Sequence, residues 1–142
     1  MDKFAHFIEA QAPLMEAVEA ELVAGRKQTH WMWFVFPQLH GLGHSPMARR
    51  YAIHSLAEAQ DYLEHSVLGP RLRRCTGIVN AIVGRSIYDI FGAPDDLKFR
   101  SSMTLFDVAA PRDVFHAALE KYCHGSPDEQ TLEMLEDANH AQ

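Results

Sequence analysis

The chain has 142 residues, 47% of them hydrophobic and 23% charged, a composition typical of one globular domain with a buried core. Its 13 basic and 19 acidic residues give a formal net charge of −6, which argues against a general nucleic-acid-binding role. No apolar run approaches the roughly 20 residues that cross a bilayer, and acids interrupt the N-terminal apolar pattern, so no secretion signal is expected. We therefore predict a cytoplasmic protein without membrane partners.

The N-terminal quarter of the chain shows a helical pattern. Apolar residues over 4–22 recur at intervals of three and four, the period of a helix with one buried face. Pro13 is expected to divide this pattern into a short and a longer helix, because proline fits a first turn but not a helix interior. Gly25 is expected to end the second helix.

Serine caps and turn residues predict the helices that follow. Ser45-Pro46 indicates an N-cap and first turn for a short helix over 47–54, and the S-x-x-E spacing from Ser55 indicates another helix after it. No segment shows the two-residue alternation of a strand. The further helices are expected from Gly69-Pro70 to Gly84, as a brief turn over 86–91, from Pro94 through Val108, over 113–124, and from a second capping-box pattern at Ser126 through Leu135. We predict a mainly α, single compact domain over 1–142, with about seven helices, little or no strand, and a frayed tail at 137–142.

The segment THWMWFVFPQLHGLGHSP, residues 29–46, concentrates aromatic side chains. Residues 31–36 are apolar on both faces of either a helix or a strand, so periodicity does not choose between the two. Left exposed, they would form a larger apolar patch than a monomer tolerates, so they must be enclosed. Because each buried indole N–H needs an acceptor, Trp31 and Trp33 indicate nearby polar groups of the protein or of a ligand. The segment is therefore either a central buried element or the wall of a pocket.

The residues after the aromatic segment carry features of an anion site. Gly41 and Gly43 allow backbone N–H groups to converge, and a helix start at Ser45 adds unpaired N–H groups. Two stretches without acids, 22–57 and 65–88, hold eight of the thirteen basic residues. The spacing of a P-loop is missing. An acid-free basic region in an acidic protein predicts a local site for a small anion, with solvated helix faces as the alternative.

Three longer motifs, HWMWFVFPQLHGLGHS, EAQDYLEHSVLGPRL and DDLKFRSSMTLF, occur in this order. With them the chain resembles a bacterial family known as domain of unknown function 1810, over nearly its whole length. The resemblance implies a single, mainly helical domain and no established activity. The basic Gly-Arg-Lys at 25–27 also belongs to this likeness.

The third motif offers candidates for chemistry. Asp95 and Lys98 lie three residues apart and share a helix face, either as a surface ion pair or as part of a polar face, with Ser101 and Ser102, turned toward the tryptophans. Serines inside a helix are poor helix formers, which favours the polar face. No nucleophile motif is present.

Other chemistry has less support in the sequence. His40 and His44 lack a third metal ligand, and we expect neither a metal nor a cofactor. A carboxylate acting as a general acid or base stays open, with Asp95, Asp96 or Glu58 as candidates.

Two functions follow as hypotheses. The first is a pocket for a small phosphorylated or nucleotide-like ligand, with hydrolysis of that ligand as a further step; enzymes that cleave ADP-ribose-type glycosidic linkages use a comparable mix of groups, an analogy only. The second is a non-enzymatic interaction module that holds a protein through its aromatic and basic surface, as a monomer or homodimer. The residues expected at the pocket are Asp95, Lys98 and His30 for catalysis, and Trp31, Trp33, Phe36, Gln38, Gly41, Gly43, Ser45, Arg49, Lys27 and Ser101 for ligand binding.

Overall fold

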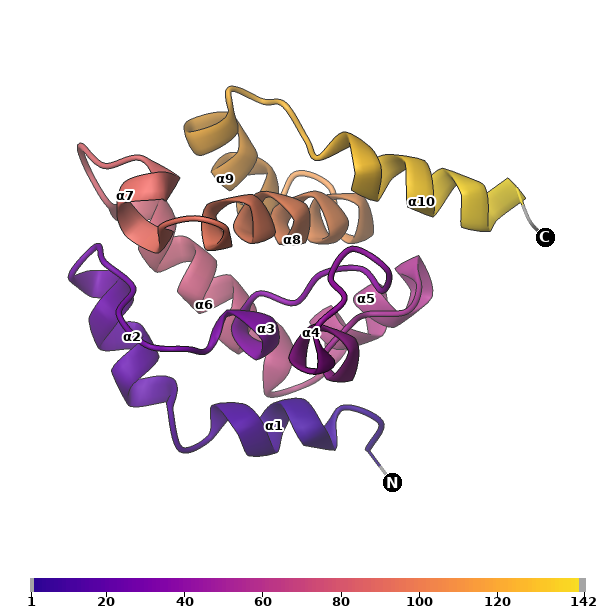
Figure 1. The fold of residues 1–142 in the computed structure, drawn as a ribbon, viewed down its shortest axis with the longest axis horizontal. Helices are drawn as coiled ribbons and strands as arrows, with labels where there is room; N and C mark the ends of the chain where they lie inside the picture. The colour runs from indigo at the N-terminus through magenta and orange to yellow at the C-terminus, as the bar shows by residue number, and fades with distance from the viewer. Residues whose placement is uncertain (1, 141–142) are drawn as a thin grey trace.

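The computed structural model describes residues 2–140 and contains, within that range, ten helices and no β-strand (Figure 1). The predicted mainly helical fold is confirmed, but about seven helices is too low a number. Three of the ten are single turns of four or five residues, too short to show a helical period. The helices are α1 (Ala5–Gln11), α2 (Met15–Val23), α3 (Met32–Val35), α4 (Pro46–Arg50), α5 (Leu56–Glu64), α6 (Leu68–Ala81), α7 (Ile87–Phe91), α8 (Asp95–Ala109), α9 (Val114–Cys123) and α10 (Glu129–His140).

Most helix ends follow the local signals in the sequence. α1 and α2 are separate helices on either side of Pro13, and Gly25 (φ 76°) follows the end of α2 in the left-handed conformation that glycine adopts without strain. The hydroxyls of Ser45 and Ser55 accept hydrogen bonds from backbone N–H groups of α4 and α5, at 3.1 and 3.0 Å. Ser86 forms a full capping box at the start of α7.

Three predicted boundaries are wrong. α4 ends at Arg50 and does not reach residue 54, because Ile53 instead pairs with Leu39 in an isolated parallel bridge. α6 takes Gly69-Pro70 into its first turn and ends at Ala81, before Gly84.

At α10 the cap is Asp128 and not Ser126. The Asp128 carboxylate accepts from the backbone N–H of Thr131 at 3.0 Å, which is the contact of an N-cap. The predicted frayed tail begins at 137, but α10 continues to His140; residues 141–142 lie outside the described residues.

α8 lies in the middle of the molecule, with α1 and α10 on opposite sides of it in Figure 1. It packs against α5, α7, α9 and α10, and its residues from Ser101 to Phe106 are all buried. Aromatic side chains fill the space around it: Phe99 contacts Phe36 and Phe91, with ring centroids 5.2 and 4.8 Å apart. Burial of these rings removes a large apolar area from water and so stabilises the packing of the helices around α8.

One buried amide connects the helices beneath α8. The Gln11 side chain of α1 donates to the carbonyl oxygen of Phe34 at 2.6 Å and to the Tyr62 hydroxyl at 3.2 Å. Its amide oxygen accepts from the Arg71 guanidinium at 3.4 Å. Because a buried polar group without partners is costly, this network fixes α1, α3, α5 and α6 relative to one another.

Candidate functional site

The aromatic segment is mainly a core element. Trp31 and Phe36 are each about 1% exposed, and α3 between them buries three of its four residues. The prediction that Trp31 and Phe36 form a pocket wall is therefore wrong, because the rings of this chain already enclose both side chains. Trp33 alone of the proposed aromatic residues is half-buried.

Glu21, at the end of α2, supplies the acceptor that the buried indole needs. Its carboxylate accepts from Trp31 Nε1 at 3.1 Å, from the backbone N–H groups of Gln28 and Thr29 at 2.6 and 2.9 Å, and from the Thr29 hydroxyl at 2.6 Å. Burial alone would raise the pKa of Glu21, but these four donors outweigh it and lower the pKa to about 2. No local pattern in the sequence indicates this role of Glu21, since its hydrogen-bond donors lie seven to ten residues further along the chain.

Replacing Glu21 by glutamine is expected to lower the free energy of unfolding at pH 7 by about 2 kcal/mol, because the charged acceptor of four donors is lost. The folded-state pKa lies below the ordinary value of 4.5, so this contribution is complete above that pH and is lost as the pH falls toward 2. Urea unfolding from pH 7 to pH 2.5 measures it. In the Glu21→Gln variant, the free energy of unfolding should fall less than in the wild type as the pH is lowered. Glu16 is an exposed acid on the same helix, so the Glu16→Gln variant should show the same pH dependence as the wild type.

Lys27, Asp95 and Lys98 form an ion bridge beside the two indoles. Lys27 Nζ lies 2.9 Å from one carboxylate oxygen of Asp95, and Lys98 Nζ lies 3.6 Å from the other. Lys27 also stacks over the Trp31 ring at 5.2 Å, and Lys98 over the Trp33 ring at 5.5 Å, so each ammonium has a cation–π contact. The Lys27 side chain is only 8% exposed. The start of the third motif thus lies close to the tryptophans through Lys27 and Lys98.

A polar cleft of about 400 Å³ opens on the other side of Lys27. We call it the basic cleft; its lining residues are Arg26, Lys27, Arg85, Tyr88, Asp89, Ile90, Phe91 and Gly92. The segment before α3 and the end of α7 form its walls, joined by a hydrogen bond of 2.7 Å from the backbone N–H of Lys27 to the carbonyl of Ile90. Of the predicted site residues, Lys27 alone lines it.

Arg85 is held rigidly in the basic cleft. Its Nε donates to the carbonyl of Gly25 at 2.8 Å, and one terminal nitrogen donates to the carbonyl of Asp89 at 2.9 Å. The Asp89 carboxylate is engaged in the capping box with Ser86, and the Ser86 backbone N–H holds the pKa of Asp89 below its usual value. No carboxylate of the described residues forms an ion pair with Arg85 or Arg26.

The two acid-free stretches only partly converge. Arg26 and Lys27 from the first meet Arg85 from the second in the basic cleft. Arg73 and Arg74 instead form ion pairs with Asp113 and Glu19. The charge pattern of the sequence therefore indicated a basic region. It did not indicate which arginines of the two stretches lie close together in the folded chain.

The loop over residues 41–44, which we call the glycine loop, lies against α10 and contributes no residue to the lining of the basic cleft. A Cβ on Gly41 would lie 2.7 Å from Met134 Cε, and one on Gly43 would lie 2.6 Å from Ala48 Cβ, so both positions are small because neighbouring side chains approach closely. Ser45 caps α4. The prediction that this loop and the tryptophans share one pocket is therefore wrong.

The other predicted residues are dispersed. Arg49 and His30 are exposed, and neither side chain has a hydrogen-bond partner within residues 2–140. Gln38 is half-buried, and its backbone carbonyl accepts a hydrogen bond from the Ile53 backbone N–H at 2.9 Å. The Ser101 hydroxyl donates to the carbonyl of Leu97 within α8 at 3.1 Å, so it serves its own helix and does not extend the polar face toward the tryptophans.

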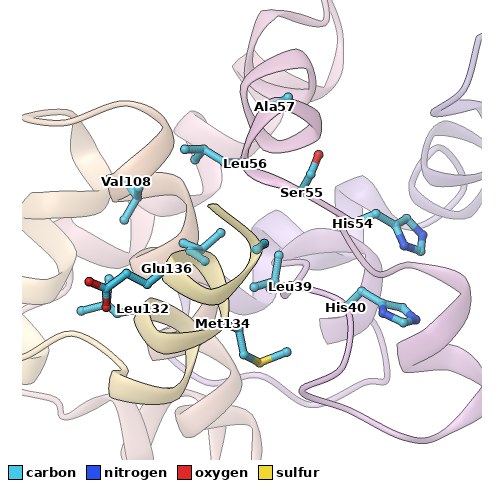
Figure 2. A pocket seen from close by; sticks show the side chains of 12 residues that line it. Leu39, His40, His54, Ser55, Leu56, Ala57, Val108, Leu132, Met134 and Glu136 are labelled. Carbon is cyan, nitrogen blue, oxygen red and sulfur yellow. The ribbon is translucent and has the colours of Figure 1, made fainter. Parts of the chain in front are cut away.

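A larger, apolar groove of about 750 Å³ lies between α10 and the segments around Leu39 and Leu56. Figure 2 shows Met134 and Leu39 near its middle, Val108 and Leu132 at one end, and the rings of His40 and His54 side by side at the other. The bridge between Leu39 and Ile53 places the two histidines next to each other, with ring centroids 4.8 Å apart. None of the predicted site residues lines this groove.

In the part of the chain that the structure describes, no three histidine, cysteine, aspartate or glutamate side chains gather as a metal site. Both cysteines are unbonded, and burial raises the pKa of the Cys75 thiol to about 12, which keeps it protonated and unreactive. Within the same residues, no helix is both long enough and apolar enough to cross a bilayer.

These features define a small, mainly helical protein with a basic cleft beside an enclosed aromatic core. The chain belongs to the family described as protein of unknown function DUF1810, whose model matches residues 1–135. Its fold is similar to the crystal structure of the conserved hypothetical protein Rv1873 from Mycobacterium tuberculosis, with 58% sequence identity, a TM-score of 0.91, and coverage of 92% of this chain and 94% of that one. No curated protein matches the chain.

Proposed function

We propose that the protein binds a small phosphorylated or nucleotide-like ligand in the basic cleft. The observation that carries the proposal is the set of three cations, Arg26, Lys27 and Arg85, around a space of about 400 Å³. Asp89 is the one carboxylate in the lining, and it is already engaged by Ser86. A concave site with an excess of cations attracts small anions.

The arginines suit phosphate recognition better than the lysine does. Backbone carbonyls hold the Arg85 guanidinium in one orientation and leave further N–H donors for a ligand. Arg26 is exposed at the same cleft. The charge of Lys27 is shared with Asp95, so its part is to keep the wall of the cleft positive and in place.

Hydrolysis of the bound ligand is the finer part of the proposal, with an ADP-ribose-type glycosidic linkage as an analogy. Asp95 is its candidate group, because Lys27 connects this carboxylate to the cleft. The water oxygen would bond to the anomeric carbon and a proton of this water would pass to the Asp95 carboxylate. The bond between the anomeric carbon and the nitrogen of the leaving base would break, and its electron pair would stay on that nitrogen. Both carboxylate oxygens face ammonium groups, which favours a positioning role for Asp95, so binding is tested first.

An interaction module with an aromatic surface receives less support, since Trp31, Phe34 and Phe36 are buried within one chain. The cytoplasmic location and the monomer or homodimer predicted from the sequence stay predictions.

Calorimetric titration of the purified protein with pyrophosphate and ADP tests the binding. We expect Arg26→Ala to weaken binding about tenfold, the value of one charge-assisted hydrogen bond of roughly 1.5 kcal/mol. Arg26 makes no ion pair within residues 2–140, so the variant should keep its wild-type melting temperature. Arg49→Ala is the matched control, because Arg49 is also exposed but lies in α4, which follows the glycine loop.

Three outcomes separate the alternatives. Loss of affinity in Arg26→Ala alone supports the basic cleft. Loss in Arg49→Ala alone would place the ligand at the glycine loop and overturn the proposed site. No measurable heat and no thermal shift with either ligand at millimolar concentration would overturn the proposal altogether.

A further inference from the structure

Resting on the proposed function, we propose that the ligand is a nucleoside diphosphate, whose base stacks on Tyr88 while its two phosphates contact the arginines of the basic cleft. Tyr88 was not among the residues selected from the sequence. It lines the basic cleft, and it is 62% exposed. Within residues 2–140, neither face of the Tyr88 ring contacts another aromatic ring or a cation.

The backbone below Tyr88 is fixed, although its ring is free. The Ser86 capping box starts α7, and the carbonyl of Tyr88 accepts from the Gly92 backbone N–H at 2.8 Å. The Arg85 guanidinium donates hydrogen bonds to the backbone carbonyls of both Gly25 and Asp89 and so connects the two walls of the cleft. An exposed aromatic ring on a fixed backbone is the arrangement that stacks a base with little loss of conformational freedom.

The charges of the lining fit two phosphate groups. Within residues 2–140, Arg26 and Arg85 form no ion pair, whereas Lys27 is paired with Asp95, so two guanidinium groups of the basic cleft are open to a ligand. They come from two walls, because Arg26 precedes α3 and Arg85 precedes α7, so neighbouring phosphates can each meet one guanidinium. The volume of about 400 Å³ also falls in the range of small-ligand pockets, about 300–1,000 Å³.

The experiment compares ADP with pyrophosphate on the full chain by calorimetric titration. We expect the wild type to bind ADP roughly tenfold more tightly than pyrophosphate, since stacking adds to the phosphate contacts. Tyr88→Ala should remove this difference and leave the affinity for pyrophosphate unchanged. Tyr88→Phe keeps the ring and should behave as the wild type. Leu97→Ala is the matched control, because Leu97 is 61% exposed and lies outside the cleft lining.

The outcomes distinguish this inference from the proposed function. Equal wild-type affinities for ADP and pyrophosphate, with both weakened in Arg26→Ala, would overturn the base-stacking inference and leave the phosphate site standing. An equal loss of both affinities in Tyr88→Ala would show that the ring supports the cleft and does not stack a base. Absence of pyrophosphate and ADP binding would overturn both proposals.

Discussion

Replacement of Gly69 by alanine is expected to lower the free energy of unfolding by at least about 3 kcal/mol, the range of severe overpacking. Gly69 is buried in the first turn of α6, close to the short segment that connects α6 to the end of α5 at Glu64. A Cβ built there would lie 2.0 Å from the carbonyl oxygen of Leu63 and 2.8 Å from its carbonyl carbon. These are backbone atoms, so no side-chain rotation relieves the contact, and α5 and α6 would have to move apart.

Gly77 provides the matched control in the same helix. Apart from the adjacent backbone of α6 itself, no atom lies within 4 Å of a Cβ built at Gly77, and alanine is a better helix former than glycine. We expect Gly77→Ala to raise the free energy of unfolding by about 0.5–1 kcal/mol. Urea unfolding followed by circular dichroism measures both variants. An unchanged midpoint for Gly69→Ala would show that the junction between α5 and α6 is looser than described.

Replacement of Asp95 by alanine is expected to cost about 2–4 kcal/mol of stability. The variant leaves Lys27, whose side chain is 8% exposed, without its carboxylate at 2.9 Å, and an unpaired charge in a nearly dry place is strongly unfavourable. The exposed pair of Lys3 and Asp61 is the control, because its side chains are 56% and 50% exposed. Asp61→Ala should cost no more than about 1 kcal/mol.

A second comparison separates the effect of losing the Lys27–Asp95 ion pair from other effects of replacing Asp95 at the start of α8. The double variant Lys27→Met, Asp95→Leu removes both charges, and we expect it to recover most of the loss, since an apolar pair of similar size avoids desolvation. Chemical unfolding of the single and double variants gives the coupling energy. If the double variant is as unstable as Asp95→Ala, then the loss comes from the start of α8 and not from the ion pair.

The sequence was most informative where a local signal decides the structure. Proline at 13, the serine caps at 45 and 55, and Gly25 all act within one helical turn, and they end or begin helices as expected. α3 was not expected as a helix because it is a single turn with no side-chain cap, and it is enclosed by side chains from the rest of the core. A single turn that is stabilised by tertiary contacts shows no helical periodicity in its own sequence.

Of the candidate site, only the concentration of basic residues could be predicted from the sequence. The acid-free stretches predicted a site for a small anion, and Arg26 and Lys27, which come from the first stretch, line the basic cleft. Their partner Arg85 lies about sixty residues away in the chain, and no local pattern indicates such a meeting. The aromatic segment was ambiguous for a physical reason: a buried core element and a pocket wall have the same composition, and the acceptor of Trp31 lies in a different helix.

The stacking of Lys27 over the Trp31 ring has a practical consequence. Lys27 contacts the basic cleft on one side and an indole on the other, so a negative charge that arrives in the cleft alters the electric field at the chromophore. The chain has two tryptophans, and Trp33→Phe would leave Trp31 as the sole indole emitter. Intrinsic fluorescence of that variant would then report occupancy of the cleft without any attached label.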